Sequence, residues 1–161
     1  MLHNLPRTPV DKARYPVIDM HTHGSYANTP EQVKSWLNAM DEPGVDKSIV
    51  LTAAHGAEFD RLYELFAPYP ARFEVWCGFD YTGYDQPGYG PAAVRELERC
   101  FAKGATGVGE LGDKGKGLFY CKPEAWGMHP DDPRLDPLFT ACHMVLIPVR
   151  SCHENAPGYR G

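Results

Sequence analysis

The stretch VIDMHTHG, at residues 17–24, decides how the rest of the chain is interpreted. Its apolar residues predict a β-strand, and its two histidines stand two positions apart before a glycine. Because side chains alternate along a strand, Asp19, His21 and His23 are expected to share one side. Neutral imidazole is a common ligand of zinc-like metals, so two rings at this spacing can bind one cation. A solvated turn is the alternative, but ligand sites of α/β proteins follow apolar strands in this way.

Length and composition indicate one globular domain, residues 1–161, with residues 1–16 as an irregular, proline-containing lead-in. The chain is 43% hydrophobic and carries a net charge of -5. This charge leaves no basic patch for nucleic acid or an anionic membrane. There is no apolar run of membrane-spanning length and no signal-peptide core, so we expect a cytoplasmic protein. The five cysteines form no Cys-x-x-Cys pair, which argues against a disulfide framework or a zinc ribbon.

Predicted strands and helices alternate along the chain. Strands are expected at 17–20, 48–52, 73–79 and 106–111, a fifth strand is expected to begin with residues 146–149, and helices are expected near 30–40, 59–66, 91–103 and 136–145. Thr29 and Pro30 are a strong helix start. This period is typical of right-handed βαβ units, and no stretch reads as a hairpin.

The fold class is therefore α/β, and we expect a partial (β/α)8 TIM barrel with about five of the eight strand–helix units. An open doubly wound sheet is the structural alternative, although no Gly-x-Gly-x-x-Gly follows any strand to mark a dinucleotide site. The connection over residues 112–133 is longer than an α/β link requires, which favours a functional or lid-like segment.

Candidate metal ligands are expected to meet at the carboxyl ends of the predicted strands. His21 and His23 end the first strand, Glu110 lies on the fourth, and His153 ends or follows the fifth. In a parallel barrel these ends line one mouth. Three imidazoles and a carboxylate would suit one or two borderline divalent metals. A solvated Glu110 is the alternative, and the apolar run around it opposes that interpretation.

At these residues the chain resembles the amidohydrolase superfamily. The resemblance rests on the Asp-x-His-x-His of residues 19–23, on the Glu110 segment, and on LDPLF at residues 135–139 leading to IPV at 147–149. Among the branches, the chain looks closest to the amidohydrolase-related one, which also contains metal-dependent decarboxylases. The resemblance extends over residues 16–149.

The resemblance implies a metal-dependent hydrolase in which an activated water attacks an amide- or ester-like carbonyl of a small-molecule substrate. A decarboxylase of the same branch is the alternative, in which the metal orients a carboxylate for loss of carbon dioxide. His21 and His23 carry over as metal ligands, and Glu110 as a strand-four ligand similar to that of TatD-type hydrolases. Zn²⁺ is the expected ion, with Mn²⁺ or Fe²⁺ as alternatives.

Three further residues are candidates for substrate binding. Lys114 and Lys116 closely follow Glu110 and would attract an anionic group, and His129 lies in the same long connection. A solvated loop is the alternative interpretation of the two lysines, and a structural role is the alternative for His129.

The chain departs from the family near its end. Leu146 stands where members have a glycine, and Cys152 stands where they have the strand-five histidine. His153 is one position late, which would turn its side chain to the opposite face of a strand. A Cys152 thiolate as ligand and an altered tail are the two explanations, and the second accounts for both departures.

The strand-six histidine and the strand-eight aspartate, the family's general base, have no counterpart in the sequence. We therefore expect an N-terminal portion of such an enzyme that is incomplete or inactive in isolation. A non-catalytic βα scaffold that self-associates into a homo-oligomer through an open barrel edge is the alternative from a different class. A TatD-type nuclease is disfavoured by the acidic charge.

Overall fold

A computed structural model describes residues 12–118, 121, 123–145 and 147–151 of the chain. Its main strands are β1 (Val17–His23), β2 (Val45–Leu51), β3 (Phe73–Trp76), β4 (Val108–Leu111) and β7 (Val149–Ser151). Its α-helices are α1 (Pro30–Asp41), α2 (Gly56–Phe66), α3 (Pro91–Lys103) and α4 (Asp136–Met144). The mixed α/β class expected from the sequence is confirmed.

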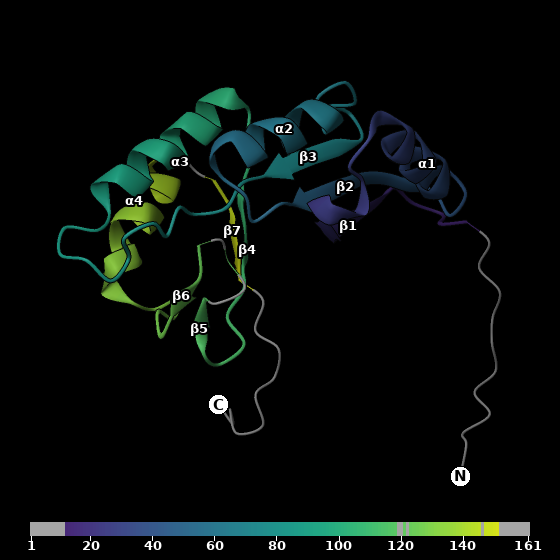
Figure 1. Ribbon diagram of the computed structural model, residues 1–161. Coiled ribbons are helices and arrows are strands. Elements are labelled where there is room, and N and C mark those ends of the chain that lie inside the picture. The colour runs from purple at the N-terminus through teal and green to yellow at the C-terminus, as the bar shows by residue number, and fades with distance from the viewer. Residues whose placement is uncertain (1–11, 119–120, 122, 146, 152–161) are drawn as a thin grey trace, which may run out of the picture.

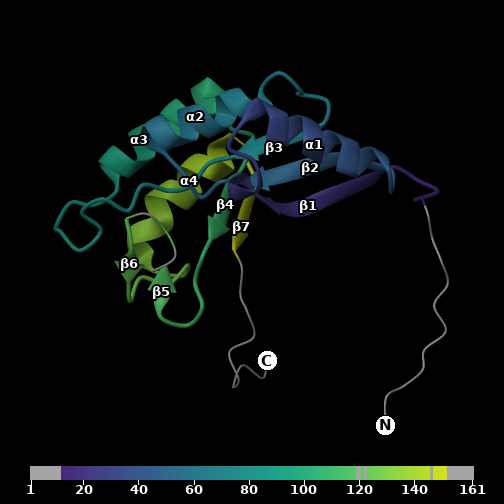
Figure 2. The ribbon, with the colours of Figure 1, turned by 45° about the vertical axis from the view of Figure 1, so that its right-hand side comes forward.

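The main strands are parallel and follow one another in chain order. β1, β2 and β3 form a three-stranded sheet in that order, and β4 pairs with β7. A single backbone bridge from Cys77 to Val108 joins the two groups. Both views place the four helices on the same side of these strands (Figures 1 and 2). Parallel strands in sequential order, joined by crossovers of the usual right hand, are expected to produce this arrangement.

The helices begin where the sequence supplies capping residues. Thr29 caps α1 by accepting a hydrogen bond from the backbone N–H of Gln32, and Pro30 occupies the first helical position. The Gln32 side chain completes the cap by accepting from the N–H of Asn28. α3 ends at Gly104, whose φ of 128° is available to glycine at low cost.

The two faces of the sheet are both apolar, as in sheets buried on both sides. Val50, Val75 and Cys77 belong to the main core with the inner faces of the helices. Ile49, Leu51 and Trp76 alternate with them and form a second buried cluster. Among the helices of the described residues, none combines the length and the apolar character needed to cross a bilayer.

The structure corrects the sequence prediction in three places. β1 continues to His23, three residues beyond the predicted end at Met20, and the two histidines lie at its carboxyl end as expected. The connection after β4 contains a short antiparallel pair, β5 (Gly117–Leu118) and β6 (Ala125–Trp126), so the expectation of no hairpin is wrong. The sequence pattern of this hairpin is weak because each of its strands has only two residues. Within its described residues, the last strand begins at Val149, although Pro148 O already accepts a hydrogen bond from the N–H of Val108 on β4 at 2.9 Å.

The backbone leaves β2 through a tight crossing beside β3 and β4. Ala53 donates a hydrogen bond to Gly109 O at 3.0 Å, and Gly78 donates to Ala54 O at 2.6 Å. Ala53 has a φ of 50°, an unfavourable conformation for a residue with a Cβ. A Cβ on Gly78 would collide with the carbonyl group of Ala53. The glycine is therefore required by this close approach of two chain segments.

We predict that Gly78→Ala destabilises the protein by about 2 kcal/mol, because a backbone neighbour has little room to move. Gly83→Ala is the matched control: its φ of 73° is strained for alanine, but no atom lies within 4 Å of the added Cβ. That strain alone costs about 1 kcal/mol. Urea unfolding measures both values. A Gly78→Ala variant as stable as the wild type would contradict the close crossing.

Candidate metal centre

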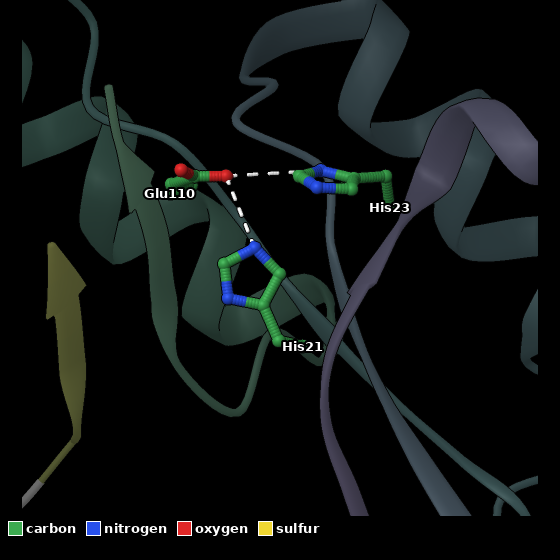
Figure 3. A group of neighbouring side chains, drawn as sticks. All are labelled: His21, His23 and Glu110. Atoms are coloured by element: carbon green, nitrogen blue, oxygen red, sulfur yellow. Dashed lines mark ion pairs between the residues drawn. The ribbon is translucent and has the colours of Figure 1, made fainter. Parts of the chain in front are cut away.

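His21, His23 and Glu110 converge at the carboxyl ends of β1 and β4 (Figure 3). One ligand atom from each side chain lies within 4.8 Å of the other two. His21 Nε2 stands 3.5 Å from Glu110 Oε2, and His23 Nδ1 stands 3.7 Å from the same oxygen. All three side chains are partly buried, with Glu110 the least exposed at 16%. Three of the four metal ligands proposed from the sequence thus lie together in the folded chain.

The separations within this cluster fit a coordination site better than a hydrogen-bonded one. Nitrogen-to-oxygen hydrogen bonds are usually about 2.9 Å long, and the two contacts here are 3.5 and 3.7 Å. Ligand atoms about 2.1 Å from a tetrahedral zinc ion lie roughly 3.4 Å from one another. The donor set is also suitable, because two imidazoles and one carboxylate form a frequent zinc site that leaves a coordination position open.

The strand and its neighbours hold the histidines in place. Thr22, between them, is 4% exposed and donates its hydroxyl to Ile49 O on β2 at 2.7 Å. The ring of His23 packs edge-on against Tyr26, with ring centres 5.6 Å apart. Tyr26 in turn contacts Trp36 of α1 at 5.7 Å. The orientation of the His23 ring is therefore tied to the packing of α1.

A cavity of about 400 Å³ opens over the cluster, within the size range of small-molecule sites. It is lined by His21, His23, Gly24, Ser25, Leu51, Thr52, Ala53, Glu110, Gly112 and Lys114. Thr52 and Ala53 are the residues of the tight crossing after β2, so the strained backbone of Ala53 forms part of the wall. Backbone strain of this kind is concentrated at functional sites.

Asp113 organises the segment that follows Glu110. Its side chain is 5% exposed and contacts His129 Nδ1 through Oδ2 at 2.6 Å. Its other oxygen accepts hydrogen bonds from the N–H groups of Gly115 at 2.7 Å and Gly117 at 3.2 Å. Burial acts to raise the pKa of Asp113, but the hydrogen bonds from His129 and the two glycines outweigh it and hold the pKa below its usual value.

The other candidate residues of the sequence lie in different environments. Lys114 and Lys116 are both exposed on the same loop, but only Lys114 is among the residues that line the cavity. His129 is 47% exposed and bonded to Asp113. His153, Cys152 and Leu146 lie outside the described residues. The pairing of Asp113 with His129 has no sequence signal, because sixteen positions and a hairpin separate the two residues.

Comparison of the chain with family models, with curated protein sequences and with solved structures finds no match. The site is therefore interpreted from its own geometry and chemistry.

We predict that Asp113→Asn destabilises the protein by about 2 kcal/mol at neutral pH, because hydrogen bonds to a charged group are replaced by neutral ones. Since the pKa of Asp113 is lower in the folded than in the unfolded chain, the ionised carboxylate stabilises the fold fully above about pH 4. This contribution is lost as the pH falls through the folded-state pKa.

The difference in unfolding free energy between the wild type and Asp113→Asn is measured by urea titration at several pH values. The exposed Asp131, on the same segment, supplies the control, and Asp131→Asn should stay within about 0.5 kcal/mol of the wild type. An Asp113→Asn penalty that does not shrink at low pH would contradict the role of the charge.

Proposed function

We propose that this chain carries the metal centre of a metal-dependent hydrolase of the amidohydrolase type, with a divalent ion held by His21, His23 and Glu110. The observation that carries the proposal is the convergence of these ligand atoms within 4.8 Å of one another at the floor of a cavity. Zn²⁺ suits the donor set, with Mn²⁺ or Fe²⁺ as alternatives. The proposed substrate is a small molecule, and the proposed compartment is the cytoplasm.

The curvature of the sheet supports a partial (β/α)8 barrel as the architecture. Neighbouring strands are about 4.8 Å apart, so β1 and β4 would be separated by roughly 14 Å across a flat sheet. His23 and Glu110 nevertheless approach to 3.7 Å. Strong curling of the sheet explains this contact. The sequential strand order and the helices on one side of the strands are also typical of a (β/α)8 barrel. An open doubly wound sheet has helices on both faces.

The chemistry follows from the residues around the cavity. A divalent ion bound there would lower the pKa of a water ligand and polarise a carbonyl or carboxylate group. Leu51 and Ala53 give part of the wall an apolar surface, while Ser25 offers a hydroxyl. A decarboxylase of the same branch would use the same ligands. The hydrolase is preferred because the open coordination position of a His₂Glu zinc site is suited to water.

We predict that the purified protein binds one Zn²⁺ per chain through this cluster. Replacing both histidines (His21→Ala with His23→Ala), or Glu110→Gln alone, should weaken zinc binding by about 100-fold or more, because a ligand is lost from the coordination sphere. The measurement is a competition titration with a chromogenic chelator, supported by elemental analysis.

His143 supplies the matched control for this experiment. It is an exposed histidine in the last turn of α4, and His143→Ala should bind zinc like the wild type. Equal zinc affinity in all variants would contradict the metal centre and, with it, the proposed hydrolase.

A second function, a scaffold that self-associates, is favoured by one observation. In the described sheet β1 pairs on one side only, with β2. Three of its apolar residues are exposed: Val17 at 38%, Ile18 at 53% and Met20 at 45%. An apolar strand edge is a template for pairing with another chain. A second copy of this chain is the partner we propose for this edge.

We predict that the sedimentation coefficient of the wild-type protein rises with concentration and that Met20→Lys reduces this rise, because a charge on β1 opposes edge pairing. Met144→Lys is the control, since Met144 is 76% exposed on α4 and lies outside the strand edge. Sedimentation that does not change with concentration in the wild type would rule out the scaffold interpretation.

A further inference from the structure

The loop between β4 and β5 is built around a buried charge. The carboxylate of Asp113 is almost fully shielded and yet stays ionised, because three donors surround it: His129 and the N–H groups of Gly115 and Gly117. The loop is tied at its other end as well, since the N–H of Gly127 donates to Lys116 O at 3.0 Å. These contacts fix the backbone on both sides of Lys114.

Fixing this backbone has one visible effect on the cavity. Lys114 is brought to its wall, whereas Lys116, two positions later in the same loop, is not a lining residue. The two lysines have the same charge and length, but the loop places only Lys114 at the border of the site. Lysine side chains have considerable rotational freedom, so a fixed backbone lowers the entropic cost of binding through Lys114.

The charges around the cavity favour an anion once a metal is bound. Apart from the imidazoles, Glu110 and Lys114 are the charged groups among the described lining residues. The two positive charges of a divalent ion, the negative charge of Glu110 and the positive charge of Lys114 give a net charge of plus two. A partly enclosed cavity with this charge concentrates anions.

We propose that the cavity takes a small anionic substrate whose carboxylate or phosphate group binds Lys114 while the reacting group faces His21, His23 and Glu110. This inference rests on the proposed function, because it assumes the metal centre. It assigns Lys114 and not Lys116 as the specificity-determining residue, and Asp113 as the residue that positions the loop.

The test uses the full chain loaded with Co²⁺, whose visible absorption responds to ligands at the metal. The probes are acetate, inorganic phosphate and acetamide, a neutral molecule of the same shape as acetate. Each is titrated into the wild type, Lys114→Met, Lys114→Arg and Lys116→Met, and the dissociation constant is read from the change in absorption.

Lys114→Met should raise the dissociation constant for acetate or phosphate about tenfold, since a charge-assisted hydrogen bond is lost. Lys116→Met should change it by less than about twofold, and Lys114→Arg should restore most of the affinity, because both substitutions keep the charge at the cavity wall. Acetamide binding should be the same in all variants. The anion with the lower dissociation constant for the wild type shows whether a carboxylate or a phosphate group is preferred.

Equal effects of Lys114→Met and Lys116→Met would overturn the inference, because the general charge of the loop would then explain them. Anion binding unchanged in Lys114→Met would overturn it too. Neither result contradicts the proposed metal centre as long as the protein binds Co²⁺. Failure of the wild type to bind Co²⁺ overturns the metal centre and this inference together.

Discussion

The curling of a parallel sheet is the constraint on which the candidate site depends. Side chains of a flat sheet stand perpendicular to it, and those of the first and fourth strands do not meet. In this chain His23 on β1 and Glu110 on β4 approach to 3.7 Å. The contact requires that the sheet of β1, β2 and β3 and the pair of β4 and β7 turn toward one another. The strained residue Ala53, just after β2, supports this turn by donating a hydrogen bond to Gly109 O on β4. Fold and site are thus consequences of the same bending.

Much of the fold could be predicted from the sequence because its signals are local. The helix start at Thr29 and Pro30 depends on neighbours within four positions, and the apolar run around Val50 needs no distant partner to be recognised as a buried strand. The two histidines could be placed at a strand end for the same reason. Grouping them with Glu110 required one additional rule, that the carboxyl ends of parallel strands share one edge.

The features that escaped prediction depend on contacts between distant residues. The hairpin of β5 and β6 has two residues per strand, too few for an alternating pattern. The role of Asp113 follows from His129, sixteen positions away, and the sequence alone does not distinguish Lys114 from Lys116. The need for Gly78 is visible only when Ala53 is seen beside it. In each case the deciding neighbour is close in space and remote along the chain.

The chain of aromatic rings beside the site couples it to the interior. His23 touches Tyr26, Tyr26 touches Trp36, and Trp36 packs against Phe66 and Phe73 at ring distances of 5.6 and 5.3 Å. A rotation of the imidazole therefore changes the surroundings of an indole two rings away. Tryptophan emission is sensitive to such changes, so the emission of Trp36 is expected to report on the orientation of the His23 ring.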